Sequence, residues 1–209
     1  MMTSIVRSNG KVFSIKDNVN RFFFPKEYLQ FEEKLSKKAK FSVRFLLNTG
    51  ARINEARNVK VEDVDLVNKR MTLRVTKTKA KKGEKHGRIR IIPLSSQFVK
   101  ILKEKIKEDN LTFDSYFGIM ENSNLNVAYK VAGVRAGIKD YYNISSHTFR
   151  KTLEVWLMAL GVDALPLTAH LGHSIGTAAQ YYVSPDIFSS DDKFAIKRII
   201  GDLYADRLR

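Results

Sequence analysis

The sequence contains no cysteine among its 209 residues. Disulfide bonds, thiolate catalysis and zinc sites built from cysteine are therefore excluded. Long apolar runs are also missing, since none approaches the roughly 20 residues that a membrane span requires. Residues 1–10 hold no apolar block of the kind that marks a signal peptide. We therefore expect a cytoplasmic protein that does not associate with membranes.

Acidic residues are few beside the basic ones, with 22 Asp and Glu against 37 Lys and Arg and a formal net charge of +15. Such a basic surface attracts polyanions, and phosphate contacts supply much of the affinity of proteins for nucleic acids. A basic protein that binds a membrane surface is the alternative. Hydrophobic residues make up 44% of the chain, which is enough for a packed core. Composition thus predicts a folded domain that binds nucleic acid.

The spacing of apolar residues predicts a mainly helical domain with a small antiparallel β-hairpin, an α+β fold. Two strands with period-two alternation are expected over residues 71–76 and 88–93, joined by a long basic tip. In the second strand, Ile89 and Ile91 alternate with arginines. A turn is expected at residues 62–65. Helical spacing predicts helices over residues 28–38, 40–48, 52–59, 98–106, 125–134, 149–160, 163–172 and 193–208. The helix at 125–134 is expected to bury Leu125, Ala128, Val131 and Val134.

Two pairs of charged residues are spaced so that each pair shares one face of a helix. Arg52 and Glu55, in a segment that begins Thr-Gly-Ala at residue 49, lie one turn apart, so the carboxylate can hold the guanidinium in place. His147 and Arg150 stand near the start of a helix, where the positive end of the dipole favours anions. Taken singly, such pairs are more often surface ion pairs or incidental neighbours.

Two further residues stand near the end of the chain. His173 follows Leu-Gly at a position that suits the end of a helix, and Tyr182 comes nine residues later. A single histidine at such a position is usually structural, and a single tyrosine is usually part of a core. The order of all these elements is more informative than any one of them.

In that order the motifs resemble those of the tyrosine recombinase family, which includes phage-type integrases and chromosome-dimer resolvases. Members of that family carry an Arg in a Thr-Gly-x-Arg-x-x-Glu setting, a lysine in a β-hairpin, His-x-x-Arg, Leu-Gly-His, and a Tyr nine residues after that His. The resemblance covers about residues 25–182. It implies a catalytic set made up of Arg52, a hairpin lysine, His147, Arg150, His173 and Tyr182. Glu55 would support this set.

The identity of the hairpin lysine is open. Counting forward from Arg52 favours Lys77, counting back from Pro93 favours Lys85, and Lys79 lies between them. We favour Lys77. The hairpin tip is also expected to bind DNA phosphates through Lys79, Lys81, Lys82 and Lys85. The alternative is that the tip is simply a solvated charged loop.

The resemblance implies that the protein breaks and rejoins DNA strands. Arg52 and Arg150 would bind the non-bridging oxygens of a phosphodiester through paired donors, with His173 as a further donor. Tyr182 would attack the phosphorus to form a 3′-phosphotyrosyl intermediate, His147 would accept its proton, and the hairpin lysine would protonate the leaving 5′ oxygen. The phosphotyrosyl bond conserves the energy of the broken phosphodiester bond, so no nucleotide cofactor is needed. Side chains supply the cations, so no metal is expected.

Members of this family usually carry a separate DNA-gripping domain before the catalytic domain. Either that domain was removed here or the chain is a minimal form. We expect residues 1–24 to be a linker segment, residues 25–188 the catalytic domain, and residues 189–209 a C-terminal amphipathic helix and tail. This last part would either dock on a neighbouring protomer or fold back on its own domain.

Double-stranded DNA is the expected partner, with self-assembly into dimers or tetramers on DNA. The setting would be the cytoplasm or nucleoid of a prokaryotic or viral system. One alternative is a type IB topoisomerase, against which the spacing from Leu-Gly-His to Tyr182 argues. The other is a non-catalytic basic DNA-binding module, which would not need all five of the motif side chains.

Overall fold

The computed structural model describes residues 3–6, 12–15, 21–74, 89–172 and 187–205. Its helices are α1 (Pro25–Glu33), α2 (Lys37–Thr49), α3 (Ile53–Arg57), α4 (Ser96–Glu108), α5 (Asn122–Arg135), α6 (Ser146–Ala159), α7 (Ala164–Leu171) and α9 (Ser190–Ile200), with 3₁₀ helices η1 (Val61–Asp63) and η2 (Tyr141–Asn143). The strands are β1 (Thr3–Val6), β2 (Val12–Ile15), β3 (Val64–Asp65), β4 (Arg70–Arg74) and β5 (Ile89–Pro93). The predicted fold class, mainly helical with a small antiparallel sheet, is confirmed. None of the helices in the described ranges is both long enough and apolar enough to cross a bilayer.

The sheet beside the helices is antiparallel in the order β3-β4-β5, and Met71 pairs with Ile92 across β4 and β5. Met71, Leu73 and Ile92 are fully buried, so one face of this small sheet packs on the helices. The turn predicted at residues 62–65 is instead η1 followed by β3. A strand of two residues is too short to show a period of two, which is why the sequence pattern did not reveal it. β1 and β2 form a separate antiparallel hairpin.

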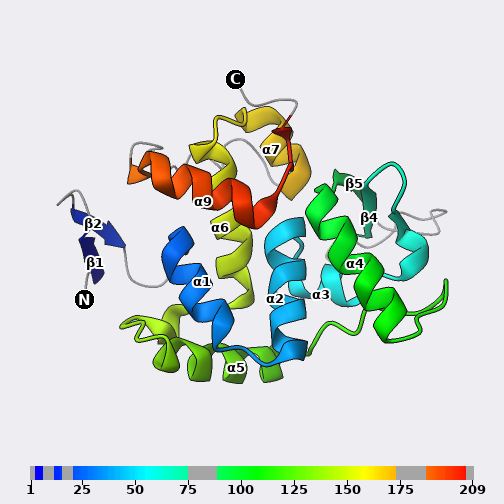
Figure 1. The fold of residues 1–209 in the computed structure, drawn as a ribbon, viewed down its shortest axis with the longest axis horizontal. Coiled ribbons are helices and arrows are strands. Elements are labelled where there is room, and N and C mark those ends of the chain that lie inside the picture. The colour runs from blue at the N-terminus through cyan, green and yellow to red at the C-terminus, as the bar shows by residue number, and fades with distance from the viewer. Residues whose placement is uncertain (1–2, 7–11, 16–20, 75–88, 173–186, 206–209) are drawn as a thin grey trace, which may run out of the picture.

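Helix α6 lies at the centre of the helical part, with α1 and α2 beside it, α5 below and α9 above in the view of Figure 1. Its start is fixed by Ser145, whose backbone N–H donates to the Thr148 side chain at 3.0 Å. Phe149, Leu153 and Trp156 are fully buried, as the sequence pattern predicted. These apolar residues recur every three or four positions, but most of the other residues of α6 are buried too, so the helix is enclosed on nearly all sides.

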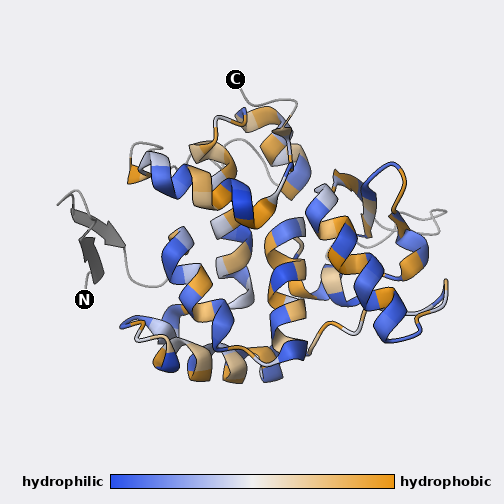
Figure 2. Ribbon diagram, viewed as in Figure 1, coloured by the Kyte–Doolittle hydropathy of each residue, from blue (hydrophilic) through white to orange (hydrophobic). Residues whose placement is uncertain are grey.

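The buried face of α5 differs from the predicted one. Val131 and Val134 are 44% and 57% exposed. The buried residues are Leu125, Tyr129, Ala132 and Gly133. The Tyr129 ring packs on Phe149 with 5.2 Å between ring centroids, and this large contact decides the rotation of the helix. Apolar and polar residues are intermixed around α5 (Figure 2), so its periodicity alone does not identify one face.

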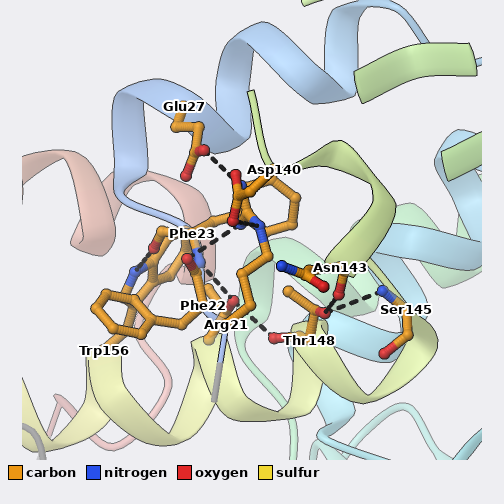
Figure 3. Close-up of polar contacts among 10 residues, drawn as sticks. Arg21, Phe22, Phe23, Glu27, Asp140, Asn143, Ser145, Thr148 and Trp156 are labelled. Atoms are coloured by element: carbon orange, nitrogen blue, oxygen red, sulfur yellow. Dashed lines mark hydrogen bonds and ion pairs between the residues drawn. The ribbon is translucent and has the colours of Figure 1, made fainter. Parts of the chain in front are cut away.

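The segment that enters the helical part at residues 21–24 lies along α6 (Figure 3). The backbone N–H of Phe23 donates to Thr152 Oγ1 at 3.0 Å, and its carbonyl accepts from Trp156 Nε1 at 2.8 Å. Arg21 is 4% exposed and forms ion pairs with Glu27 and Asp140. Two carboxylates therefore hold one buried guanidinium at the point where the chain joins the core.

The C-terminal helix α9 packs on α1 and α6 of its own molecule. Ile196 and Ile200 are fully buried, and Leu203 is 2% exposed. Phe194 on the other side of the helix is 66% exposed. Of the two arrangements expected for this amphipathic segment, α9 shows the one in which it folds back.

Candidate active site

Arg52 and Glu55 are placed by a tight turn between α2 and α3. Gly50 ends α2 at φ +58°, and a Cβ there would stand 2.6 Å from Leu171 Cδ2, so only glycine fits. Arg52 is the N-cap of α3, and its backbone N–H donates to Glu55 Oε2 at 3.0 Å. Arg52 Nη1 donates to Glu55 Oε1 at 2.8 Å. The Arg52–Glu55 pair predicted from the sequence is present, and it is not a surface pair because Glu55 is 1% exposed.

Glu55 has a third donor that sequence reasoning missed. Arg90 of β5 donates from Nη2 to Glu55 Oε2 at 2.7 Å. Burial by itself raises the pKa of Glu55, but the hydrogen bonds from Arg90 and from Arg52 outweigh burial and bring the pKa below its ordinary value. Glu55 is therefore an anion at neutral pH, which allows it to orient two guanidinium groups.

An alternation of isoleucine with arginine, as in β5, is typical of a strand whose apolar residues face the core, but the structure shows the reverse. These two isoleucines are 55% and 63% exposed. Residues two apart share a face of a strand, so Arg90 lies on the same face as the fully buried Ile92. The sequence did hold one signal for this face, since Ile92 is an apolar residue that breaks the alternation and shares a face with Arg90.

Arg150 joins three segments from its position on the second turn of α6. It is 4% exposed, donates from Nη1 to the Gly50 carbonyl at 2.7 Å and donates from Nη2 to the Leu171 carbonyl. Burial, and then the charges of Arg52 and Arg90, lower the pKa of Arg150 to about 9. Arg150 remains a cation at neutral pH and is held rigidly by two carbonyl groups.

His147 lies one turn before Arg150 and is exposed as a residue. Partial desolvation by the surrounding protein, and then the positive charges of Arg150 and Arg52, bring its pKa below the ordinary value. Its imidazole is therefore neutral near pH 7 and can accept a proton.

Arg52, His147 and Arg150 line one open cleft of about 390 Å³. Its other walls come from the start of α3, the first turns of α5 and the start of α6, with Ala51, Ile53, Asn54, Asn122, Asn126, Ser145 and Ser146. A larger hollow of about 480 Å³, between α1, α4 and α9, contains none of the predicted site residues. The structure thus brings Arg52 together with His147 and Arg150, from which it is separated by about half of the chain.

The remaining predicted site residues lie outside the described residues. They are Lys77, Lys79, Lys81, Lys82, Lys85, His173 and Tyr182. The last described residue before His173 is Gly172, which ends α7 at φ +68°. No group of three His, Asp or Glu side chains suited to a metal ion occurs within the described ranges. The roles of these seven residues, and chemistry without a metal, stay predictions.

Besides His147, a histidine that was not predicted as a site residue lies close to the cleft. His170 of α7 is 2% exposed, with Nε2 3.0 Å from the Thr49 carbonyl oxygen and Nδ1 3.0 Å from the Tyr204 hydroxyl. It therefore ties the turn before Arg52 to the end of α7. No short sequence signal could have found it, since its partners lie 121 and 34 residues away.

Comparison with known proteins agrees with this geometry, because residues 16–187 match the phage integrase family. The chain belongs to this family. It is 32% identical over 148 residues to a probable integrase/recombinase of Acholeplasma phage L2, covering 66% of this chain and 46% of that protein. It is 30% identical over 149 residues to the tyrosine recombinase XerA of Saccharolobus solfataricus, covering 69% and 45%. This integrase-family chain therefore spans about half the length of these relatives.

Solved structures of integrases and recombinases share the fold. A crystal structure of XerA recombinase superposes with a TM-score of 0.63 at 20% identity, covering 93% of this chain and 68% of that chain. The catalytic domain of bacteriophage HP1 integrase gives a TM-score of 0.58 at 20% identity, covering 89% and 98%. At these identities the likeness concerns the fold alone.

Proposed function

We propose that this chain is the catalytic part of a site-specific DNA recombinase that cleaves and rejoins DNA through a 3′-phosphotyrosyl intermediate on Tyr182. The observation that carries the proposal is the convergence of Arg52, His147 and Arg150 on one cleft. Membership of the phage integrase family, with relatives named as integrases and Xer recombinases, favours recombination over the relaxation of supercoils or mere DNA binding.

The cleft suits a phosphodiester. Attack on phosphorus places negative charge on the non-bridging oxygens, and preorganised cationic donors stabilise that charge without having to reorganise. Arg52 is 30% exposed and can offer its free N–H groups, while Glu55 holds its orientation. Arg150 spends one N–H on each of two carbonyl groups, and a guanidinium has five. Its remaining N–H groups can serve the phosphate.

The nucleophile and the acid are assigned by the family motifs. Tyr182 would attack the phosphorus, its proton would pass to neutral His147, and a hairpin lysine, Lys77 by preference, would protonate the 5′ oxygen that leaves. The same bonds form and break in reverse when a 5′ hydroxyl attacks the phosphotyrosine. His173 follows Gly172 at the end of α7, and the Leu171 carbonyl at that end binds Arg150, which supports a place for His173 near the phosphate.

Double-stranded DNA is the proposed partner. Among the solved relatives, the Tn1549 transposon integrase is described in complex with transposon right end DNA, and XerH is described bound to its difH substrate. The net charge of +15 supports the same partner here. The basic tip at Lys79, Lys81, Lys82 and Lys85 is proposed to bind the DNA backbone. Self-assembly on DNA, a location at the nucleoid and the division at residues 24 and 188 are part of this proposal.

The test traps the covalent intermediate. Because the target sequence is not defined, the substrate is a pool of nicked suicide duplexes with a randomised centre, incubated with the chain in EDTA and analysed by denaturing electrophoresis. We expect a covalent protein–DNA band for the wild type and for Tyr181→Phe, and none for Tyr182→Phe. A band that persists in Tyr182→Phe, or a wild type that forms no band with any duplex in the pool, refutes the proposal.

A further inference from the structure

Arg90 is a buried cation that the chemistry above does not use. Its side chain is 9% exposed, and Nη2 is bonded to Glu55 Oε2 at 2.7 Å. Among the described residues, its buried Nε and Nη1 have no hydrogen-bond partner. Buried donors are nearly always satisfied in proteins, so a guanidinium with two unsatisfied nitrogens points to a role other than stability.

Glu55 is held from two sides, and Arg90 provides one of them. Within the described part of the chain, Oε1 accepts only from Arg52 Nη1, whereas Oε2 accepts from the backbone of Arg52 and from Arg90. Arg52 comes from the start of α3 and Arg90 from β5, so the carboxylate links the sheet to the helix. If Glu55 turned away from Arg52, its bond to Arg90 would also break. Arg90 thus restrains the orientation of Arg52 through Glu55.

Positive charges outnumber negative ones around Glu55. Three guanidinium groups, those of Arg52, Arg90 and Arg150, gather near the carboxylate of Glu55. The charge of Glu154 also acts on Arg150, but that carboxylate forms its own ion pair with Lys151. Arg90 also lies against the end of α7, since a Cβ on Gly172 would stand 3.2 Å from its Nη1. Crowded cations that lack counterions are unfavourable in a protein interior, and an anion in the cleft would relieve that cost.

We propose that Arg90 is a positioning residue of the phosphate site. It holds Glu55 so that the Arg52 guanidinium faces the phosphate, and it adds positive potential without touching the substrate. Its nitrogens other than Nη2 are inaccessible to solvent, so it acts through Glu55 rather than by direct contact. The identity of the phosphate as DNA rests on the proposed function, whereas the coupling of Arg90 to Arg52 does not.

The first experiment compares Arg90→Met with Arg74→Met. Arg74 serves as the control, because it lies on the neighbouring strand β4 and pairs with another buried carboxylate, that of Asp63, and neither residue lines the cleft. Its side chain is 40% exposed, so the melting temperatures correct for the difference in burial. Single-turnover formation of the covalent complex, the dissociation constant for the duplex and the melting temperature are measured for each. We expect Arg90→Met to slow covalent complex formation by roughly tenfold or more at saturating DNA, as when a group that orients a catalytic residue is lost. Arg74→Met should leave the rate unchanged.

Equal losses of rate in the two variants would mean that Arg90 matters only for stability, and would overturn the proposal. A double-mutant cycle with Glu55→Gln then tests the route. If Arg90 acts through Glu55, Arg90→Met should slow the Glu55→Gln enzyme by less than about twofold. Additive losses would show that Arg90 does not act through Glu55, and would also overturn it.

A second experiment needs no DNA, so it separates this inference from the proposed function. The Nε–Hε group of Arg52 is followed by ¹⁵N relaxation in the 23.9 kDa chain, with inorganic phosphate as the probe ligand. In Arg90→Met, and not in Arg74→Met, we expect a lower order parameter for Arg52 and weaker phosphate binding. If the wild type forms no covalent complex, the proposed function fails while this measurement still decides the role of Arg90. An unchanged Arg52 signal overturns the role.

Discussion

Acid should destabilise this protein through one buried histidine. His170 is 2% exposed, and burial, with smaller contributions from the charges of Arg90 and Arg150, lowers its pKa to about 4 although its hydrogen bond to Thr49 acts in the opposite direction. The Thr49 carbonyl can only accept, so Nε2 carries the hydrogen, and Nδ1 accepts from the Tyr204 hydroxyl. Because burial penalises the charged ring, the folded protein favours the neutral form.

The magnitude follows from proton linkage. An unfolded histidine binds a proton near pH 6.5, whereas His170 in the folded state does so only near pH 4. Between these values the unfolded state holds more protons, so the free energy of unfolding falls as the pH falls. The stability that neutral His170 contributes is fully present above about pH 6.5 and is lost as the pH falls toward 4. Relative to pH 7.5, the loss from His170 should reach about 2 kcal/mol at pH 5 and about 3 kcal/mol near pH 4.

The assay is urea unfolding of the wild type and of His170→Gln at half-unit steps from pH 7.5 to pH 5. Carboxylates and the other histidines titrate in both proteins, so the difference between the two curves isolates His170. We expect His170→Gln to be the less stable protein at pH 7.5 and the gap to shrink by about 2 kcal/mol at pH 5. Parallel curves over this range would refute the argument that the ring is buried in its neutral form.

Three other substitutions test the packing described above. Gly50→Ala should lower the free energy of unfolding by at least about 1–2 kcal/mol, because φ is +58° and a Cβ would overlap Leu171, and it should also slow covalent complex formation; normal stability in urea would contradict the close approach. Arg21→Met should lower the free energy of unfolding by about 3 kcal/mol, since it leaves the carboxylates of Glu27 and Asp140 without their cation. A loss below about 1 kcal/mol in thermal unfolding would show that these ion pairs are dispensable. Val131→Lys should change stability by less than about 0.5 kcal/mol, because Val131 is 44% exposed on α5, whereas a large loss would mean that this face of the helix is covered in solution.

The sequence by itself determined the local parts of the site. His147 and Arg150 are three residues apart, and a helix turn of 3.6 residues places such a pair on one face wherever the helix lies. Arg52 and Glu55 have the same spacing, but they meet because Arg52 is the N-cap of α3 and Glu55 is the third residue of that helix, whose side chain reaches back to the N-cap. The burial of Phe149 and Trp156 on α6 followed from the same periodicity. The fold class and the family could be predicted because these motifs occur in a specific order.

Only the tertiary structure decided which residues from distant segments meet. Arg90 reaches Glu55 because Ile92 fixes which face of β5 turns inward, and the two isoleucines beside it had suggested the other face. Tyr129, not the valines, sets the rotation of α5, because a large ring gains more from the core than a small side chain does. Contacts between residues separated by tens of positions depend on how whole elements pack, and no spacing within one element encodes that packing.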